Sequence, residues 1–371
     1  MTHKMSIPFY DLKQINLRYR KLFQQALDDV LESGWFILGS QVDDFEKAFA
    51  AYCQTKYAVG VGNGLDALYL ALKSLGIRTG DEVIVPSHTF IATWLAVSMC
   101  GAKPVPVEPR MDTYNIDPDK IEEKITKRTK AIIPVHLYGQ ACEMDAIMRL
   151  ARRHHLSVVE DNAQAHGAMY NGKITGSFGK VNATSFYPVK NLGALGDGGA
   201  VTTNNKAMAD YISTFRNYGS GKKYYHEMAG INSRLDELQA AFLLIKLKML
   251  ETDRQQRAKV AQQYHAELSG TGDLILPAVA EKATHVYHLF VVRTQYRDKL
   301  KKALEQKGIG CMIHYPVPPH MQRAYSSLNF LPDELPIARK LTGSILSLPI
   351  FPGLAPPDVS KVCATITRFF K

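Results

Sequence analysis

Short apolar runs alternate with segments whose apolar residues recur every three or four positions through most of the first 270 residues. The runs predict strands and the periodic segments predict helices. We expect strands at 57–61, 82–86, 103–107, 131–135 and 157–160, with a further apolar run at 200–203. We expect helices at 17–33, 41–52, 65–75, 89–100, 118–125, 144–154, 205–215 and 235–268. This alternation predicts an α/β fold with a mostly parallel sheet that is covered on both faces.

The pattern changes after the long helix, where the elements become shorter and a proline-rich turn occurs at 315–320. Strand-like segments at 287–292 and 310–314 and helices at 297–307 and 358–370 predict a compact α+β unit. A chain of 371 residues is long for one hydrophobic core. We therefore expect a large α/β domain over residues 1–249 and a smaller C-terminal domain over residues 250–371.

The composition is that of an ordinary globular protein, with 46% hydrophobic and 22% charged residues. No apolar stretch is long enough to cross a membrane, and residues 1–14 lack the apolar core of a signal peptide. We therefore expect a cytoplasmic protein. Five scattered cysteines, none of them in a CxxC motif, predict reduced and mostly buried thiols and no metal site.

The formal net charge of +10 is spread along the chain and is not gathered in a patch with aromatic residues. This distribution argues against a nucleic-acid-binding protein. A solvated basic surface is the simpler interpretation. The functional alternative is a small anionic substrate, such as a phosphate ester or a nucleotide, that is attracted by the field of the protein.

The clearest chemical signal is the stretch TSFYPVKNLGALGDGGA at 184–200. Lys190 comes two residues after Pro188, whose ring fixes φ and stiffens the approach. Four glycines follow, and glycine permits positive φ and a close passage of the backbone past a ligand. This stretch alone leaves two interpretations open, a partly desolvated lysine presented to a carbonyl compound and an ordinary surface lysine.

Two further segments that follow strands carry residues that could bind a ligand. Gly62-Asn63-Gly64 lies between a strand and a helix, where free backbone N–H groups can bind an anion, although a plain tight turn is the alternative. Because Leu65 occupies the place of the third glycine, a dinucleotide-binding fingerprint is excluded here. The strand at 157–160 is followed by Asp161 and Gln164, at the edge of a parallel sheet where ligands bind. Asp161 could also be a simple helix cap.

Together, a lysine in a glycine-rich loop, an aspartate at a strand end and an anion site at a helix start describe a site for pyridoxal 5′-phosphate. Lys190 would form the Schiff base and Asp161 would keep the pyridine nitrogen protonated. The helix start would bind the phosphate. Gln164 would hydrogen-bond the ring hydroxyl, and Phe90 would stack on the ring face.

The sequence resembles the DegT/DnrJ/EryC1/StrS sugar aminotransferases, a branch of the fold type I enzymes that use pyridoxal phosphate. The matching segments run nearly from end to end: IPFYDL at 7–12, SGWFILG at 33–39, FE at 45–46, GNGLDAL at 62–68, GDEVIVPSHTFIAT at 80–93, PVHLYGQ at 134–140, EDNAQAHGA at 160–168, SFYPVKNLGALGDGGA at 185–200, INSRLDELQAA at 231–241 and HYPVPPHMQ at 314–322. The lysine segment is the most specific of them. The resemblance implies a large cofactor-binding α/β domain and a small C-terminal α+β domain.

The resemblance also implies roles for individual residues. Lys190 matches the Schiff-base lysine, Asp161 the partner of the pyridine nitrogen and Gln164 the partner of the ring hydroxyl. The backbone of Gly64 and Leu65, with Asn63 and Ser185, matches the phosphate-binding groups. The family often reads Ser-Gly-Thr where this chain reads Asn63-Gly64-Leu65, so two hydroxyls are missing and backbone N–H groups must contribute more. Asn232 matches a residue that reaches the phosphate of the neighbouring subunit, which implies a homodimer with shared active sites.

By resemblance, the reaction is a ping-pong transfer from L-glutamate, released as 2-oxoglutarate, to a keto sugar carried on a nucleotide. Family members that act at sugar C3 tend to share the sequence of residues 187–199, whereas those that act at C4 tend to carry Thr-Thr-Gly-Glu-Gly-Gly or a similar sequence around the lysine. We therefore expect a dTDP-3-keto-6-deoxyhexose as substrate and a dTDP-3-amino-3,6-dideoxyhexose as product, for O-antigen, lipopolysaccharide or another surface glycan. Candidates for holding the sugar or diphosphate, each of which could equally be a packing residue, are Tyr187, Tyr218, His314, Tyr315 and His320.

The alternative within the family is an aminotransferase for a UDP-linked or a 4-keto sugar. A dehydratase of the same fold would carry histidine at the position of Lys190, so the lysine argues against that activity. A dinucleotide-dependent oxidoreductase would need the glycine fingerprint that fails at residues 60–65. We expect no binding of nucleic acid or membrane.

Overall fold

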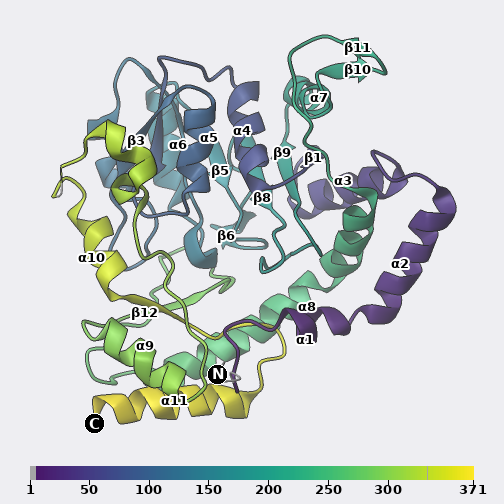
Figure 1. The fold of residues 1–371 in the computed structure, drawn as a ribbon. Coiled ribbons are helices and arrows are strands. Elements are labelled where there is room, and N and C mark those ends of the chain that lie inside the picture. Colours follow the sequence, from purple (N-terminus) through teal and green to yellow (C-terminus); the bar gives the residue numbers. More distant parts are fainter. Residues whose placement is uncertain (1–5, 332) are drawn as a thin grey trace.

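The computed structural model describes residues 6–331 and 333–371 (Figure 1). Residues 1–5, on which part of the signal-peptide prediction rests, lie outside the described residues. A seven-stranded sheet in the order β1-β9-β8-β5-β4-β2-β3 forms the centre of the larger part of the molecule. Its strands are β1 (Tyr57–Val61), β2 (Glu82–Pro86), β3 (Lys103–Val107), β4 (Thr129–Ile132), β5 (Ser157–Asp161), β8 (Val181–Ser185) and β9 (Gly199–Thr203).

The pairs β3–β2, β2–β4, β4–β5 and β5–β8 are parallel, whereas β9 runs antiparallel to β8 and to β1. The prediction of a mostly parallel sheet is therefore confirmed. Every residue of β2, β8 and β9 is buried, as expected for strands with cover on both faces.

Helices cover both faces of this sheet (Figure 1). Val83 and Val85 of β2 pack in one hydrophobic cluster with residues of α4 and α5, while Ile84 packs in another cluster with residues of α6. This division follows from the alternation of side chains along a strand. The helices of the larger part are α1 (Leu12–Leu17), α2 (Arg20–Ser33), α3 (Ser40–Tyr52), α4 (Gly64–Ser74), α5 (Ala92–Met99), α6 (Met144–Arg153) and α7 (Lys206–Phe215).

Helix α8 (Glu237–Leu268) is 32 residues long and connects the two parts of the molecule (Figure 1). Its first half packs against α3, whereas Tyr264 and Leu268 near its end belong to a second core. That core also contains residues of the C-terminal elements and, from the other end of the chain, Ile7 and Ile15. The C-terminal elements are β12 (Phe290–Arg293), α9 (Arg297–Gln306), α10 (Pro336–Ser344), β13 (Ile345–Leu348) and α11 (Pro356–Phe370). A domain boundary near residue 250 stays a prediction.

Several element predictions were wrong in detail. The expected helix at 118–125 consists of two short 3₁₀ helices, η1 (Pro118–Lys120) and η2 (Glu122–Lys124), since Ile125 already returns to extended backbone. The expected strand at 310–314 is reduced to one bridge between Met312 and Ser347, because β12 takes β13 as its partner instead. Neither α10 nor β13 was anticipated. The remaining short elements are β6 (Met169–Tyr170), β7 (Lys173–Ile174), β10 (Ser220–Lys222), β11 (Tyr225–His226), η3 (Leu137–Gly139), η4 (Pro319–Met321) and η5 (Arg323–Leu328).

All five cysteines are free and buried, as predicted. Among the described residues, no group of three or more His, Cys, Asp or Glu side chains is placed to hold a metal ion. Within the same ranges, no helix has both the length and the apolar character needed to cross a bilayer.

Candidate active site

The predicted lysine, aspartate and anion site meet at the carboxyl ends of β5 and β8. These two strands are parallel neighbours, with Asp161 opposite Ala183, so Asp161 and Ser185 both lie at this edge of the sheet. Helix α4 begins at Gly64 beside Ser185. The sheet thus brings together groups that are more than 100 residues apart in the sequence, at the edge where α/β sheets bind ligands.

Asp161 is buried at the end of β5 and is held in place by two hydrogen bonds. Its Oδ2 accepts a bond of 2.9 Å from the Thr93 hydroxyl, and its Oδ1 accepts one of 3.2 Å from the Ala163 N–H. Burial raises the pKa of Asp161, while these two bonds and the nearby Lys190 act in the opposite direction. Asp161 can therefore stabilise the turn after β5 and still bind a ligand as predicted, since its bond to Ala163 uses only Oδ1.

Lys190 is half-buried, and burial lowers its pKa to about 8, although the Asp161 carboxylate acts to raise it. A solvated surface lysine would keep its ordinary value near 10.5. The lowered pKa therefore favours the interpretation of Lys190 as a reactive amine, because the neutral form is the nucleophile and the base.

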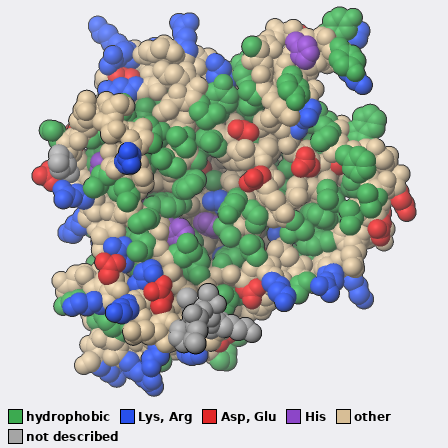
Figure 2. Space-filling view, viewed as in Figure 1, with side chains coloured by type: hydrophobic (Ala, Val, Ile, Leu, Met, Phe, Trp, Pro, Cys, Tyr) green, Lys and Arg blue, Asp and Glu red, His purple; other side chains and the backbone are tan. Residues whose placement is uncertain are grey.

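Three histidines lie close enough to Lys190 to respond to its charge. Burial first, and the charge of Lys190 second, lower the pKa of His166 to about 3 and that of His314 to about 4. The same causes lower the pKa of His288 well below its ordinary value. The lowered pKa makes each of these histidines a weaker base than Lys190, so Lys190 is the strongest base among the four groups. Figure 2 shows histidine side chains in a hollow near the centre of the displayed face.

The glycines after Lys190 permit close contacts within the chain and do not provide the positive φ that was predicted. None of Gly193, Gly196, Gly198 and Gly199 has positive φ, so that part of the expectation was wrong. They are needed because the chain passes close to itself. A Cβ on Gly193 would lie 2.3 Å from the Pro188 carbonyl oxygen, and one on Gly199 would lie 2.4 Å from the Asn63 carbonyl oxygen.

The start of α4 provides the candidate phosphate site. Asn63 caps the helix, since its Oδ1 accepts a 2.9 Å bond from the Asp66 N–H and its Nδ2 donates to Asp66 Oδ2 at 3.0 Å. The Asn63 side chain is thus engaged within its own turn. The backbone N–H groups of Gly64 and Leu65 and the Ser185 hydroxyl are the groups best suited to an anion at this helix terminus.

Gln164 connects the cofactor candidates to the C-terminal part of the chain. Its Oε1 accepts a 2.6 Å bond from the Tyr138 N–H, and its Nε2 donates a 2.9 Å bond to the Tyr315 hydroxyl. The Phe90 ring lies 5.4 Å from the Tyr315 ring at an angle of 40°. Phe90 and Gln164 both contact Tyr315, and their roles at the ring of the cofactor stay a prediction.

The five substrate candidates divide into different environments. Tyr315 contacts Gln164 and Phe90, and its neighbour His314 bonds to the Ser347 hydroxyl at 2.9 Å and stacks on Phe9. Tyr187 is exposed, directly before the lysine loop. The other predicted binding residues contact different parts of this chain. Tyr218 packs under Arg234, and His320 packs against Phe330. Asn232 is exposed, and its backbone pairs with that of Asn217.

Sequence reasoning gave no role to Tyr138, which joins several parts of the site. Its hydroxyl lies 2.8 Å from His88 Nε2 and donates to the His314 carbonyl oxygen, while its N–H holds Gln164. Thr93, which holds Asp161, was missed as well. A signal for both existed, because Tyr138 follows β4 and Thr93 follows β2 at the edge of the sheet where ligands were expected.

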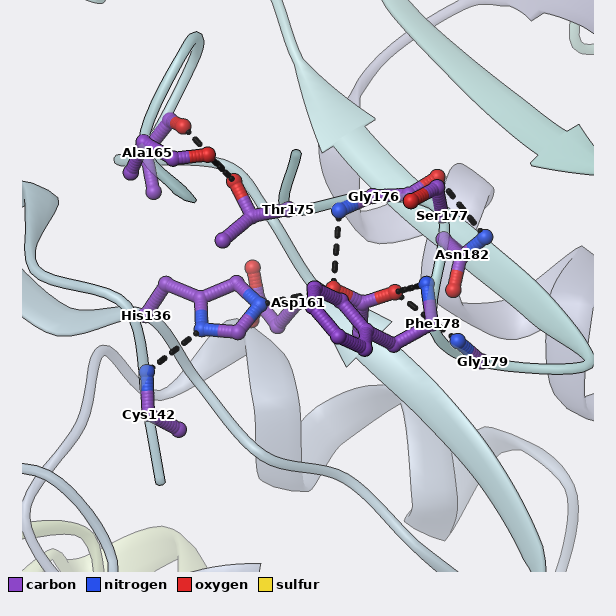
Figure 3. Close-up of polar contacts among 12 residues, drawn as sticks. His136, Cys142, Asp161, Ala165, Thr175, Gly176, Ser177, Phe178, Gly179 and Asn182 are labelled. Atoms are coloured by element: carbon purple, nitrogen blue, oxygen red, sulfur yellow. Dashed lines mark hydrogen bonds and ion pairs between the residues drawn. The ribbon is translucent and has the colours of Figure 1, made fainter. Parts of the chain in front are cut away.

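A buried carboxylate supports Asp161 from the other side of the strand. Glu160 accepts bonds from the N–H groups of Gly176 (2.8 Å), Phe178 (2.5 Å) and Gly179 (2.8 Å), and it lies 2.9 Å from His136 Nε2. His136 Nδ1 accepts a 3.0 Å bond from the Cys142 N–H, so Nε2 carries the proton and donates to Glu160. Figure 3 shows this network around the turn that precedes β8. It fixes the connection between the strands that carry Asp161 and Ser185.

The residues present fit pyridoxal 5′-phosphate. Asp161 is a buried carboxylate for the pyridine nitrogen, Lys190 is an amine of lowered pKa, and α4 begins against Ser185 with no room for a side chain on Gly64. The buried Thr184 hydroxyl beside Ser185 has no hydrogen-bond partner among the described residues, so a polar group remains available there.

Comparison with known proteins agrees with this arrangement. The model of the DegT/DnrJ/EryC1/StrS aminotransferase family matches residues 18–367. The dTDP-3-amino-3,6-dideoxy-α-D-galactopyranose transaminase of Aneurinibacillus thermoaerophilus is 53% identical over 98% of this chain and 99% of its own length. The dTDP-3-amino-3,4,6-trideoxy-α-D-glucose transaminase of Streptomyces venezuelae is 50% identical over 98% of this chain and 96% of its own length.

Among solved structures, S. venezuelae DesV in complex with a ketimine intermediate superimposes with a TM-score of 0.97. The two chains are 49% identical, and the match covers 98% of each. The fold type I architecture is therefore confirmed. Enzymes of this family depend on pyridoxal 5′-phosphate, and the chain carries the matching groups. This chain belongs to the DegT/DnrJ/EryC1/StrS family and is a pyridoxal 5′-phosphate-dependent aminotransferase.

Proposed function

We propose that this enzyme transfers an amino group from L-glutamate to C3 of a dTDP-linked 3-keto-6-deoxyhexose. The observation that carries the reaction type is the buried Asp161 beside Lys190, whose pKa is lowered to about 8. The sugar position and the nucleotide rest on the similarity, over almost the whole chain, to two transaminases named for dTDP-linked 3-amino sugars. The product would be a dTDP-3-amino-3,6-dideoxyhexose for O-antigen or another surface glycan, made in the cytoplasm.

When bound, pyridoxal phosphate supplies an electron sink that stabilises negative charge at the carbon next to the transferred nitrogen. Asp161, buried and held by Thr93 and Ala163, would keep a proton on the pyridine nitrogen by pairing with it as a carboxylate. Lys190 Nζ would accept and return the proton of the substrate carbon as the general base and acid. The start of α4 and Ser185 would hold the phosphate, and Phe90 and Gln164 would hold the ring.

We propose a homodimer in which Asn232 reaches the phosphate site of the partner copy. Asn232 is exposed, and its backbone pairs with Asn217. Helix α2 and the segment after it expose large apolar side chains, including Leu31 at 55% and Trp35 at 61%. Several large apolar side chains exposed on one segment are typical of a protein–protein interface. Sedimentation at micromolar concentration should give twice the chain mass, and Leu31→Glu should shift it towards the monomer.

The spectrum of the purified protein tests the cofactor role of Lys190. We expect an absorbance band at roughly 410–430 nm that L-glutamate bleaches. Reduction with borohydride should leave the cofactor attached to the peptide that contains Lys190. The Lys190→Ala protein should lose the attachment, and its turnover should fall by roughly 10²–10⁴-fold. The exposed Lys180 offers a matched control, since Lys180→Ala should keep both. Attachment that persists in Lys190→Ala would overturn the assignment.

A panel of keto sugars tests the substrate. The proposal predicts turnover of dTDP-3-keto-6-deoxyhexoses with L-glutamate and slow or no turnover of dTDP-4-keto and UDP-3-keto sugars. Use of the 4-keto compounds alone would refute the C3 assignment, and a preference for UDP-linked sugars would refute the assignment of dTDP as the nucleotide.

The role of Asn232 is tested by measuring the affinity of the protein for the cofactor. Asn232→Ala should weaken retention of pyridoxal phosphate, and unchanged affinity would contradict a role across the interface.

A further inference from the structure

The loop that carries Lys190 is tied to helix α8 at two points. Within the loop, the Lys190 N–H bonds to the Tyr187 carbonyl at 2.8 Å, and the Ala194 N–H bonds to the Phe186 carbonyl at 2.7 Å. From α8, Gln239 Oε1 accepts a 2.8 Å bond from the Leu195 N–H, and Lys246 Nζ donates to the Gly193 carbonyl oxygen. The loop has no helical or strand hydrogen bonds between residues 190 and 198, so these contacts, together with those of Asn191 to Val286 and His288, hold it in place.

Gln239 and Lys246 are two turns apart on α8 and so lie on the same face of the helix. They offer the loop opposite kinds of hydrogen-bonding group. Gln239 supplies an acceptor to an N–H group, and Lys246 supplies a donor to a carbonyl group two residues away. A single rigid helix therefore fixes both the position and the orientation of residues 193–195.

Packing alone does not explain an ammonium group at residue 246. Lys246 is 6% exposed, and burial lowers its pKa to about 8. Besides Gly193, it donates to Asn16 Oδ1 at 3.2 Å, while the nearest carboxylate to affect it, Asp253, is already bound to Arg18. Burying a charged group is costly unless it makes hydrogen bonds, and an apolar side chain would fill the site without that cost. The bond to Gly193 is thus the feature that requires a lysine.

The position of Gly193 is coupled to that of Lys190 because Gly193 contacts Pro188, two residues before the lysine. A Cβ on Gly193 would lie 2.3 Å from the Pro188 carbonyl oxygen, so the backbone of residue 193 is pressed against the residue two places before the lysine. A shift of Gly193 must therefore move Pro188 or open the turn around Lys190. Such a movement would expose Lys190, whose pKa is lowered to about 8 by burial.

We propose that Gln239 and Lys246 are positioning residues that hold the glycine-rich loop from α8 and thereby keep the Lys190 amine in its buried place. The proposal rests on the role assigned to Lys190 above. Neither residue contacts the cofactor candidates, so both act through the loop backbone.

The test measures the pH profile of Lys190 itself. The full-length protein, freed of cofactor, is given short pulses of an amine-acylating reagent at pH 6 to 10, and labelling of the Lys190 peptide is measured by mass spectrometry. The unmodified protein should show a midpoint near the pKa of about 8. Lys246→Met and Gln239→Leu should each raise the midpoint by about one unit, because a looser loop admits water to the amine. The absorbance of the protein loaded with pyridoxal phosphate, titrated over the same range, should shift as well.

Two variants are controls. Gln239→Glu keeps an acceptor for the Leu195 N–H and should retain the original midpoint, whereas a change of packing alone would not distinguish Glu from Leu. Lys248→Met removes an exposed lysine two residues along the same helix and should change nothing. Should Lys246→Met fail to fold, judged by its far-UV circular dichroism, the half-buried Gln239 decides the question.

An unchanged midpoint in folded Gln239→Leu would overturn the positioning role. That outcome is distinct from failure of the proposed function, in which borohydride would attach no cofactor to Lys190. The labelling profile reports the surroundings of the amine in either case.

Discussion

A Cβ atom on Gly64 would lie only 2.5 Å from the Cβ of Ser185, so the first turn of α4 and the end of β8 are in direct backbone contact. This contact places the free N–H groups of the helix start beside the serine hydroxyl. We propose that the two elements form one anion site, because glycine leaves no side chain between them.

Gly64→Ala should therefore weaken cofactor binding. The added methyl group must push α4 away from Ser185, and a loss of about 1.4 kcal/mol already lowers the affinity tenfold. We expect at least that loss in a titration of the cofactor-free protein with pyridoxal phosphate. Gly343 in α10 is the matched control, since a Cβ there would meet nothing within 4 Å. Unchanged affinity in a folded Gly64→Ala protein would contradict the phosphate assignment.

Tyr138→Phe should impair use of the sugar substrate more than cofactor binding. The change removes the hydroxyl that bonds to His88 and to the His314 carbonyl but keeps the N–H that holds Gln164. We expect KM for the keto sugar to rise by roughly tenfold, which corresponds to the loss of one or two buried hydrogen bonds. Steady-state kinetics with both substrates measure the effect. A rise in KM for the amino donor alone would argue against this role.

Glu160→Gln should destabilise the protein without touching the cofactor. An amide in place of the carboxylate directs a donor towards N–H groups that need an acceptor, and it removes the negative charge that accepts the bond from His136 Nε2. We expect a loss of roughly 3 kcal/mol in the free energy of unfolding, as found when buried charge-assisted bonds are broken. Denaturant unfolding gives the value. Glu251→Gln, at an exposed position, should cost little.

Stability should fall as the pH drops from about 6.5 to 4. The pKa of His88 is lowered to about 4 by burial, whereas an unfolded histidine has a pKa near 6.5. Between these values the unfolded chain binds more protons, so the free energy of unfolding decreases with falling pH, by about 3 kcal/mol for one such group. His88→Gln should make the dependence shallower, and the exposed His226→Gln should not. If the free energy of unfolding changes equally with pH in the unmodified protein and in both variants, His88 contributes nothing to this pH dependence.

The order and type of the main elements follow from the sequence because burial on both sheet faces imposes continuous apolar runs on the strands. The runs at 57–61, 82–86 and 103–107 match β1, β2 and β3 at both ends. The C-terminal part was less predictable. There, β12 pairs with β13 across more than 50 residues, and no local pattern distinguishes that partner from residues 310–314.

The chemistry of the site was readable where it depends on residue type. Lys190, Asp161, Gln164 and Phe90 were predicted as cofactor residues from their types and positions, and these roles stay predictions. The parallel pairing of β5 and β8 places Asp161 and Ser185 at the same edge of the sheet. The glycines of the loop were recognised as necessary, but the reason given for them was partly wrong. Their close contacts with Pro188 and Asn63 arise between segments that the sequence does not place beside each other.

The fold class and the cofactor could thus be predicted from the sequence, and Lys190 could be named as the candidate for the reactive lysine, because these predictions depend on apolar periodicity and on residues adjacent in the chain. The tertiary structure alone decided what holds that lysine in place. The lowered pKa of Lys190, the bond from Thr93 to Asp161 and the contacts from Gln239 and Lys246 to the loop all join segments distant in sequence. Such contacts depend on how the helices pack around the sheet, and burial exists only once that packing has formed.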